Sequence, residues 1–124
     1  MSVAVRCIVD DVGICSAFYV EQLGFTVEQD WGGPFAILAR ADLRLWLSGP
    51  GSSAARPMPD GGTPSAGGWN RFVIEVEDID AEVARLREAG VRFRSAVVRG
   101  PGGSQIVLDD PAGNPVELFQ PAGP

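Results

Sequence analysis

The chain repeats one pattern of residues in its two halves, and this duplication constrains the fold more than any other feature of the sequence. Segment 9–12 matches segment 76–79, Gly24 matches Gly90, and segment 41–50 matches segment 112–121. The three offsets are nearly equal, which indicates an internal repeat. Because 124 residues are one domain in length, we expect two copies of one structural unit within a single domain.

The first half is predicted to form a strand, a helix and three further strands. Val3, Val5, Cys7 and Val9 alternate with other residues, as in a strand with one buried face. Asp11 stands where a carboxylate can cap a helix over 12–23, and Gly24 can end that helix. The remaining strands are expected at 25–30, 35–39 and 43–47.

The second half is predicted to repeat this order. A strand at 71–76 is followed by Asp78 as the cap of a helix over 79–89, which Gly90 ends. Further strands are expected at 91–97, 105–108 and 116–119. The segment 100–103 (GPGG) has no helix after it, so we interpret it as a hairpin turn rather than a phosphate-binding loop.

The two repeats are joined by a segment with a different composition. Residues 49–68 contain six Gly, four Pro and three Ser, which is typical of a linker or a long loop. We therefore divide the single domain into repeat one at 1–48, a linker at 49–68 and repeat two at 69–124. A loop of this length inside a small domain often has a function.

Two residue types are absent, and their absence excludes much familiar catalytic chemistry. The chain has no histidine, and all ten of its basic residues are arginine. A Ser-His-Asp triad, a histidine-ligated metal, a Schiff-base lysine and a P-loop lysine are therefore excluded. The net charge of −6 argues against nucleic acid as a partner. The apolar runs are too short for a membrane span, and we expect a cytoplasmic protein.

Short motifs placed in the same order in both halves point to a known family. They are Val9-x-Asp11, Ala17-Phe18-Tyr19 and Leu23-Gly24-Phe25, then Val76-x-Asp78, Leu86-x-x-Ala89-Gly90-Val91 and 110–118 (DPAGNPVEL). With these motifs the chain resembles the vicinal oxygen chelate superfamily of glyoxalases, bleomycin-resistance proteins and dioxygenases. The resemblance implies an α+β fold in which tandem βαβββ repeats form a curved-sheet cup, with the helices on its convex side.

The resemblance also locates the positions that hold a metal in metal-dependent members of the superfamily. Carried onto this sequence, they are Ala4, Trp46, Arg71 and Glu117. Only one of these four side chains can bind a cation, whereas a tight catalytic site needs about three protein ligands. The chain is therefore more similar to the metal-free binding proteins of the superfamily, and we expect neither a metal nor another cofactor.

Several residues have both a structural and a ligand-binding interpretation. Glu117 either binds ligand or forms an ion pair with Arg71, and the pair is favoured because an unpaired buried carboxylate is costly. Trp46 either forms an aromatic wall or fills the core. The remaining candidates for ligand binding are Arg71 itself, Arg6 on the predicted cup face, Trp31 and Trp69 beside glycine-rich turns, and Met58 in the linker.

These observations predict metal-independent binding of a hydrophobic or aromatic small molecule, such as an antibiotic that is sequestered for self-resistance. We expect no catalytic residue in such a protein. The alternative is an enzyme of the same superfamily, a lyase, isomerase or dioxygenase-like protein, that uses Glu117 as a base or as its sole retained metal-ligand position. Because a single cup leaves sheet edges open, we also expect a homodimer.

Overall fold

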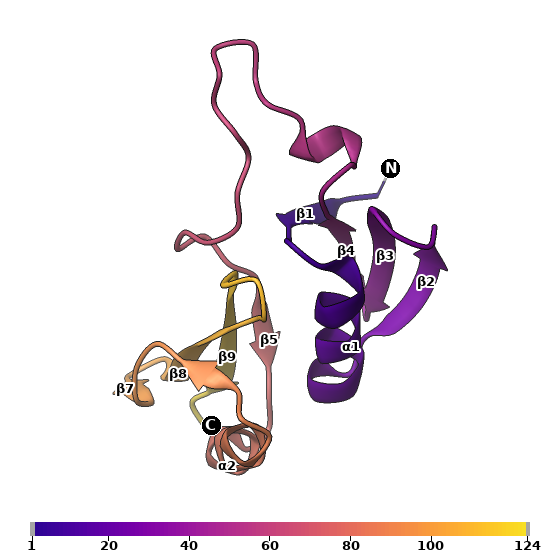
Figure 1. The fold of residues 1–124 in the computed structure, drawn as a ribbon. Coiled ribbons are helices and arrows are strands. Elements are labelled where there is room, and N and C mark those ends of the chain that lie inside the picture. Colours follow the sequence, from indigo (N-terminus) through magenta and orange to yellow (C-terminus); the bar gives the residue numbers. More distant parts are fainter. Residues whose placement is uncertain (1, 124) are drawn as a thin grey trace. The chain divides into compact units, whose positions relative to one another are not determined.

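The structure is a computed structural model that describes residues 2–123, and it divides into two compact units at residues 67 and 68. The first unit contains, in order, β1 (Ala4–Ile8), α1 (Val12–Leu23), β2 (Thr26–Asp30), β3 (Phe35–Arg40), β4 (Leu43–Ser48) and the short 3₁₀ helix η1 (Ser53–Ala55). The second contains β5 (Val73–Glu75), α2 (Ile79–Glu88), β6 (Arg92–Phe93), β7 (Val98–Gly100), β8 (Gly103–Asp109) and β9 (Pro115–Pro121). Both units are visible in Figure 1.

The first unit is a mixed four-stranded sheet with the order β1-β4-β3-β2. Strand β1 runs parallel to β4, and the other neighbours are antiparallel. Helix α1 covers one face of this sheet (Figure 1). The core between helix and sheet contains the fully buried residues Cys15, Tyr19, Leu38, Leu45 and Leu47.

Local chemistry fixes both ends of α1 at the residues that the sequence predicts. The carboxylate of Asp11 accepts a hydrogen bond from the backbone N–H of Ile14 at 3.0 Å, which satisfies one free donor of the first turn. At the other end Gly24 has a φ of 73°, a left-handed conformation that favours glycine. The predicted helix boundaries are confirmed.

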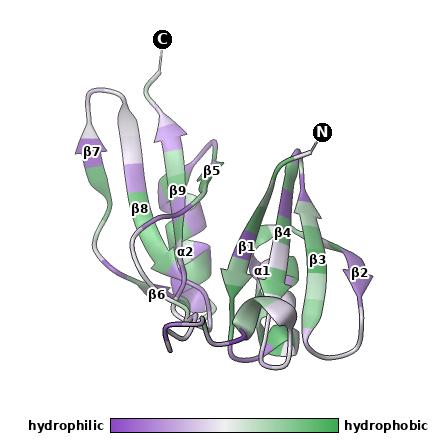
Figure 2. Ribbon diagram, turned by 90° about the horizontal axis from the view of Figure 1, so that it is seen from above, coloured by the Kyte–Doolittle hydropathy of each residue, from purple (hydrophilic) through white to green (hydrophobic). Residues whose placement is uncertain are grey.

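The second unit is a five-stranded sheet with the order β5-β9-β8-β6, in which β7 also pairs with β8. Strand β5 runs parallel to β9, as β1 does to β4. Helix α2 is capped by Asp78, whose carboxylate accepts from the N–H of Ala81 at 3.1 Å. The apolar residues along these strands and α2 appear green in Figure 2. The core of this unit includes Ile79, Leu86, Ile106, Leu108 and Leu118.

The expected strand over 91–97 is wrong, because this segment forms two short strands separated by an irregular stretch. Strand β6 ends at Phe93, and β7 begins at Val98. The hydroxyl of Ser95 donates to the carbonyl of Ala96 at 2.9 Å, a local hydrogen bond that competes with strand pairing. The strand expected over 71–76 is also shorter than predicted and covers only Val73–Glu75.

The predicted hairpin turn at 100–103 is confirmed. Strands β7 and β8 pair antiparallel up to Gly100 opposite Gly103, which leaves Pro101 and Gly102 as the loop. A Cβ atom at Gly103 would lie 2.2 Å from the carbonyl oxygen of Gln120, and the φ of Gly103 is 147°. Glycine is therefore required at this position by both backbone conformation and space.

The α+β fold class that the family resemblance implies is confirmed as two curved mixed sheets, each with one helix. Within residues 2–123, no helix combines the length and the apolar character needed to cross a membrane.

Candidate functional site

Each sheet has one face covered by its helix and one face on the other side, which we call its open face. In the first unit, strand register and alternation place nine side chains on the open face. They are Ala4, Arg6, Ile8, Phe35, Ile37, Ala39, Arg44, Trp46 and Ser48. The predicted orientation of Ala4, Arg6 and Ile8 away from α1 agrees with this register.

Arg6, Phe35 and Trp46 form an aromatic cluster on the first open face. The guanidinium carbon of Arg6 lies 4.9 Å from the centroid of the Trp46 ring and 5.7 Å from that of Phe35. The rings of Phe35 and Trp46 meet edge to face, with centroids 5.9 Å apart. Arg6 also donates from Nη1 to the hydroxyl of buried Ser48 at 3.0 Å. These contacts hold the guanidinium against aromatic surface.

Trp31 extends this cluster at the end of the sheet. Its ring centroid lies 5.2 Å from that of Phe35, and 57% of the residue is exposed. The sequence-predicted residues Arg6, Trp31 and Trp46 are thus connected through Phe35. Strand register is the signal that could have placed Phe35 near Arg6 and Trp46, because Arg6 pairs with Trp46 while Phe35 and Ile8 both pair with Ser48.

A hollow of about 490 Å³ opens next to Trp46 on the same unit. Its lining includes Ala4 and Ile37 from the open face together with Trp46. Two further lining residues, Arg44 and Glu28, form an ion pair with 2.9 Å between Nε and Oε2. The hollow therefore combines an aromatic wall, a small apolar patch and an already neutralised charge pair.

Arg71 and Glu117 form the predicted ion pair in the second unit. Nε of Arg71 lies 2.9 Å from Oε1 of Glu117, and the side chains are 26% and 10% exposed. Arg71 also donates from Nη1 to the carbonyl of Trp69 at 3.2 Å. Glu117 faces the open side of the second sheet, where it pairs with Val73 and Val107 in neighbouring strands.

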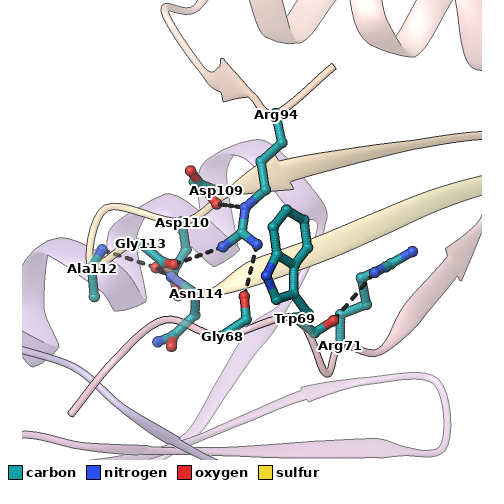
Figure 3. A network of polar contacts seen from close by, with 9 residues as sticks. All are labelled: Gly68, Trp69, Arg71, Arg94, Asp109, Asp110, Ala112, Gly113 and Asn114. Atoms are coloured by element: carbon teal, nitrogen blue, oxygen red, sulfur yellow. Dashed lines mark hydrogen bonds and ion pairs between the residues drawn. The ribbon is translucent and has the colours of Figure 1, made fainter. Parts of the chain in front are cut away.

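Arg94 is a structurally important residue that the sequence did not single out. It donates to the carboxylate of Asp109 at 2.7 Å, to the carbonyl of Gly68 at 2.7 Å and to the carbonyl of Gly113 at 3.2 Å (Figure 3). Its guanidinium also lies 4.5 Å from the ring centroid of Trp69. Arg94 thus joins the start of the second unit to the turn between β8 and β9. No local motif marks it, because its partners are distant in sequence.

The motif at 110–114 is explained by a tight turn. The carboxylate of buried Asp110 accepts from the N–H groups of Ala112 and Asn114, both at 2.9 Å (Figure 3). Gly113 has a φ of 88° and donates to the carbonyl of Asp110. These residues set the start of β9, and thereby the position of Glu117 along that strand.

The predicted site residues fall into two groups, one in each unit. Arg6, Trp31, Trp46 and Met58 belong to the first unit, and Trp69, Arg71 and Glu117 to the second. Met58 is 48% exposed, and Trp69 is 69% exposed with its ring next to the guanidinium of Arg94. Ligand binding by each of these residues stays a prediction.

Comparison with known proteins places the chain in a family. Residues 3–118 match the model of the Glyoxalase/Bleomycin resistance protein/Dioxygenase superfamily. The chain therefore belongs to this superfamily, which includes both antibiotic-binding resistance proteins and enzymes.

Individual relatives span this range. The chain is 27% identical to the uncharacterized protein YaeR of Escherichia coli (strain K12), over 94% of this chain and 92% of that protein. It is 28% identical to TnmS3, an antibiotic binding protein from Streptomyces sp. CB03234, with a TM-score of 0.72 and coverage of 98% and 96%. Lactoylglutathione lyase from Agrobacterium tumefaciens shares the fold, with 21% identity, a TM-score of 0.74 and coverage of 97% and 92%.

The donor set of this chain does not fit the metal that many members of the superfamily hold. Ala4 and Trp46 offer no ligand atom, Arg71 is a cation, and Glu117 already accepts a hydrogen bond from Arg71. Among residues 2–123, no group of three or more histidine, cysteine, aspartate or glutamate side chains is placed to hold a metal ion. No step of a mechanism can therefore be assigned to a metal held by these four positions.

Proposed function

We propose that the protein binds a hydrophobic, partly aromatic small molecule without a metal ion. The observation that carries this proposal is the replacement of the four metal-ligand positions by Ala4, Trp46 and a closed Arg71–Glu117 pair. Ala4 leaves space where a metal-binding side chain would otherwise stand, and Trp46 supplies an aromatic wall. Both residues line the same hollow on the first open face.

Sequestration of an antibiotic is the biological role we propose for this binding. The similarity to an antibiotic binding protein over nearly the whole chain supports it. A sequestering protein needs tight binding and no turnover, and it therefore needs no activated base or nucleophile. The mutual neutralisation of Arg71 and Glu117 suits that requirement.

We further propose that the protein acts as a homodimer. Strand β1 lies at one edge of the first sheet and β5 at one edge of the second, and among the described residues neither has a strand on its outer side. Exposed strand edges favour pairing with another chain. Light scattering coupled to size-exclusion chromatography is the direct test, and a monomer at micromolar concentration would contradict this part of the proposal.

The test of binding is a thermal-shift screen of aromatic natural products, followed by calorimetry of each hit. A ligand present at 100 times its dissociation constant adds about 2.7 kcal/mol to the free energy of unfolding. Trp46→Leu should weaken binding of a hit at least several-fold. Phe18→Leu on helix α1, on the opposite side of the same sheet, is the matched control and should leave affinity unchanged. Equal effects of the two variants would contradict the proposal.

The same hits separate binding from catalysis. An enzyme that uses Glu117 as a base would convert a bound ligand, and Glu117→Gln would abolish conversion while leaving binding in place. We expect instead that each hit is recovered unchanged after prolonged incubation. Chromatographic detection of a product that requires Glu117 would favour the enzymatic alternative.

A further inference from the structure

Arg6 differs from the other two arginines that flank the proposed binding surfaces. Arg44 is paired with Glu28, and Arg71 with Glu117. Arg6 has no carboxylate within ion-pair distance among residues 2–123, and the one hydrogen bond that its side chain makes there is the bond from Nη1 to Ser48. A guanidinium has five N–H donors, so most of the donors of Arg6 are available to a ligand.

The surroundings of Arg6 hold these donors in a fixed orientation. The guanidinium lies against the rings of Trp46 and Phe35, and Ser48, which accepts its hydrogen bond, is fully buried. A side chain fixed in this way loses little conformational entropy when it binds a partner. Arginine presents parallel N–H groups that match a carboxylate or a similar planar anion.

We infer that the ligand of the first open face is a planar aromatic molecule with an anionic oxygen group, which Arg6 binds while the ring system packs along Trp46. This inference rests on the proposed function and specifies the chemical class of its ligand. Trp46 is the connecting element, because it contacts Arg6 and also lines the hollow. A ligand in the hollow could therefore reach past the indole to the free donors of Arg6.

The two acidic residues that line the hollow determine which way round such a ligand would bind. Glu28 and Asp42 line the hollow, and Glu28 is neutralised by Arg44. The negative charge of Asp42 lies on the hollow side of Trp46 and would repel an anion. The anionic group of the ligand is therefore favoured on the other side of Trp46, next to Arg6. The net charge of −6 has little influence on this orientation, because salt at physiological strength screens exposed charges that are more than about 8 Å away.

The inference is tested with two probes of one shape and different charge, 2-naphthoate and 2-naphthamide. Both carry a bicyclic ring similar in size to indole, and only the carboxylate is charged at neutral pH. Calorimetry of the full-length protein should show about tenfold tighter binding of 2-naphthoate, as expected for a charge-assisted hydrogen bond. Sodium chloride should weaken binding of 2-naphthoate and leave 2-naphthamide unchanged.

Variants then assign the preference to a residue. Arg6→Gln should abolish the preference for 2-naphthoate and leave the affinity for 2-naphthamide unchanged, whereas Trp46→Leu should weaken both. Arg99→Gln, which removes an exposed arginine of the second unit, is the matched control and should keep the preference. Thermal unfolding of each variant establishes that it folds, and Arg6→Lys provides a second, charge-conserving variant that should restore part of the preference.

The outcomes separate this inference from the proposed function. Equal binding of both probes by the unaltered protein, or a preference that Arg6→Gln leaves intact, would overturn the role of Arg6 while leaving aromatic binding in place. Binding of neither probe at millimolar concentration would overturn the inference, and a negative natural-product screen as well would contradict the proposed function.

Discussion

Arg71 and Glu117 are 46 positions apart in the sequence, and Nε of the first lies 2.9 Å from Oε1 of the second. The pairing follows from topology, because β5 and β9 are adjacent parallel strands and Arg71 lies two residues before the start of β5. The pair converts a carboxylate that could ligate a metal into a neutralised polar group. This neutralisation supports the proposed binding of a ligand without a metal ion.

Removal of Arg71 should destabilise the protein more than removal of the whole pair. Arg71→Met leaves Glu117 as a carboxylate without a cation, at 10% side-chain exposure, and we expect a loss of about 2–3 kcal/mol. The double variant Arg71→Met with Glu117→Leu removes both charges and should lose less. Urea unfolding followed by circular dichroism measures these two variants and Glu117→Leu alone, and strictly additive losses would show that the two side chains do not interact.

The purified protein should contain no stoichiometric transition metal. Ala4 and Trp46 supply no ligand atom, and one carboxylate beside a guanidinium is too weak a donor set for a tight site. Elemental analysis after expression in metal-supplemented medium checks this. About one zinc, iron, nickel or manganese ion per chain that disappears in Glu117→Ala would contradict the prediction.

Arg94→Lys should destabilise the second unit although it conserves the charge. The guanidinium binds Asp109, Gly68 and Gly113 at once, and an ammonium group cannot reproduce this planar set of hydrogen bonds. We expect a loss of about 2 kcal/mol and a change in tryptophan fluorescence, because Trp69 loses its stacking partner.

Arg99→Lys is the control for Arg94→Lys. Arg99 pairs with Asp80, but the two side chains are 59% and 68% exposed, and exposed ion pairs contribute little to stability. We expect hardly any change in urea midpoint for this variant. Equal urea midpoints for the two lysine variants would show that the hydrogen bonds of Arg94 contribute no more to stability than an exposed ion pair does.

Gly103→Ala should be strongly destabilising, whereas Gly102→Ala should be tolerated. A Cβ at Gly103 would lie 2.2 Å from the carbonyl oxygen of Gln120, and nothing lies within 4 Å of a Cβ at Gly102. Steric overlap and backbone strain together predict a loss of about 3 kcal/mol for Gly103→Ala. Thermal unfolding of the two neighbouring variants checks the difference, and equal melting temperatures would contradict it.

The fold was predictable from the sequence because its determinants are local and repeated. Asp11 and Asp78 cap helices that begin at the next residue, and the alternation along β1 fixes which face meets the helix. The break after Phe93 was not predictable, because the alternating residues of 91–97 continue through it. It depends on the side-chain bonds of Arg94 and Ser95, which no periodicity reveals.

The candidate site was predictable only in part, for the same physical reason. The Arg71–Glu117 pair could be inferred because the repeat aligns the last strand with the first strand of its unit. The cation–π contacts of Arg6 and the participation of Phe35 depend on rotamers and on strand register. Such contacts between distant segments have no signature in a single sequence.

The linker supplies one further prediction, which concerns Met58. This side chain is 48% exposed, and its backbone is held in a turn. Met58 donates to the carbonyl of Gly62 at 2.6 Å, and Gly61 donates to the carbonyl of Met58 at 2.8 Å. A flexible thioether on a defined turn suits contact with an aromatic ligand. Met58→Ala should therefore weaken ligand binding several-fold and leave the fold intact.

Calorimetry with a screening hit measures the affinity of Met58→Ala, and circular dichroism measures its fold. Ser65→Ala, an exposed polar truncation in the same linker, is the control and should bind as the unaltered protein does. The alternative is that the linker packs against a partner chain or along the outer surface of the protein. In the first case Met58→Ala would shift the dimer toward monomer in size-exclusion chromatography while ligand affinity stayed the same, and in the second case neither measurement would change. Either result would show that Met58 is not part of the binding surface.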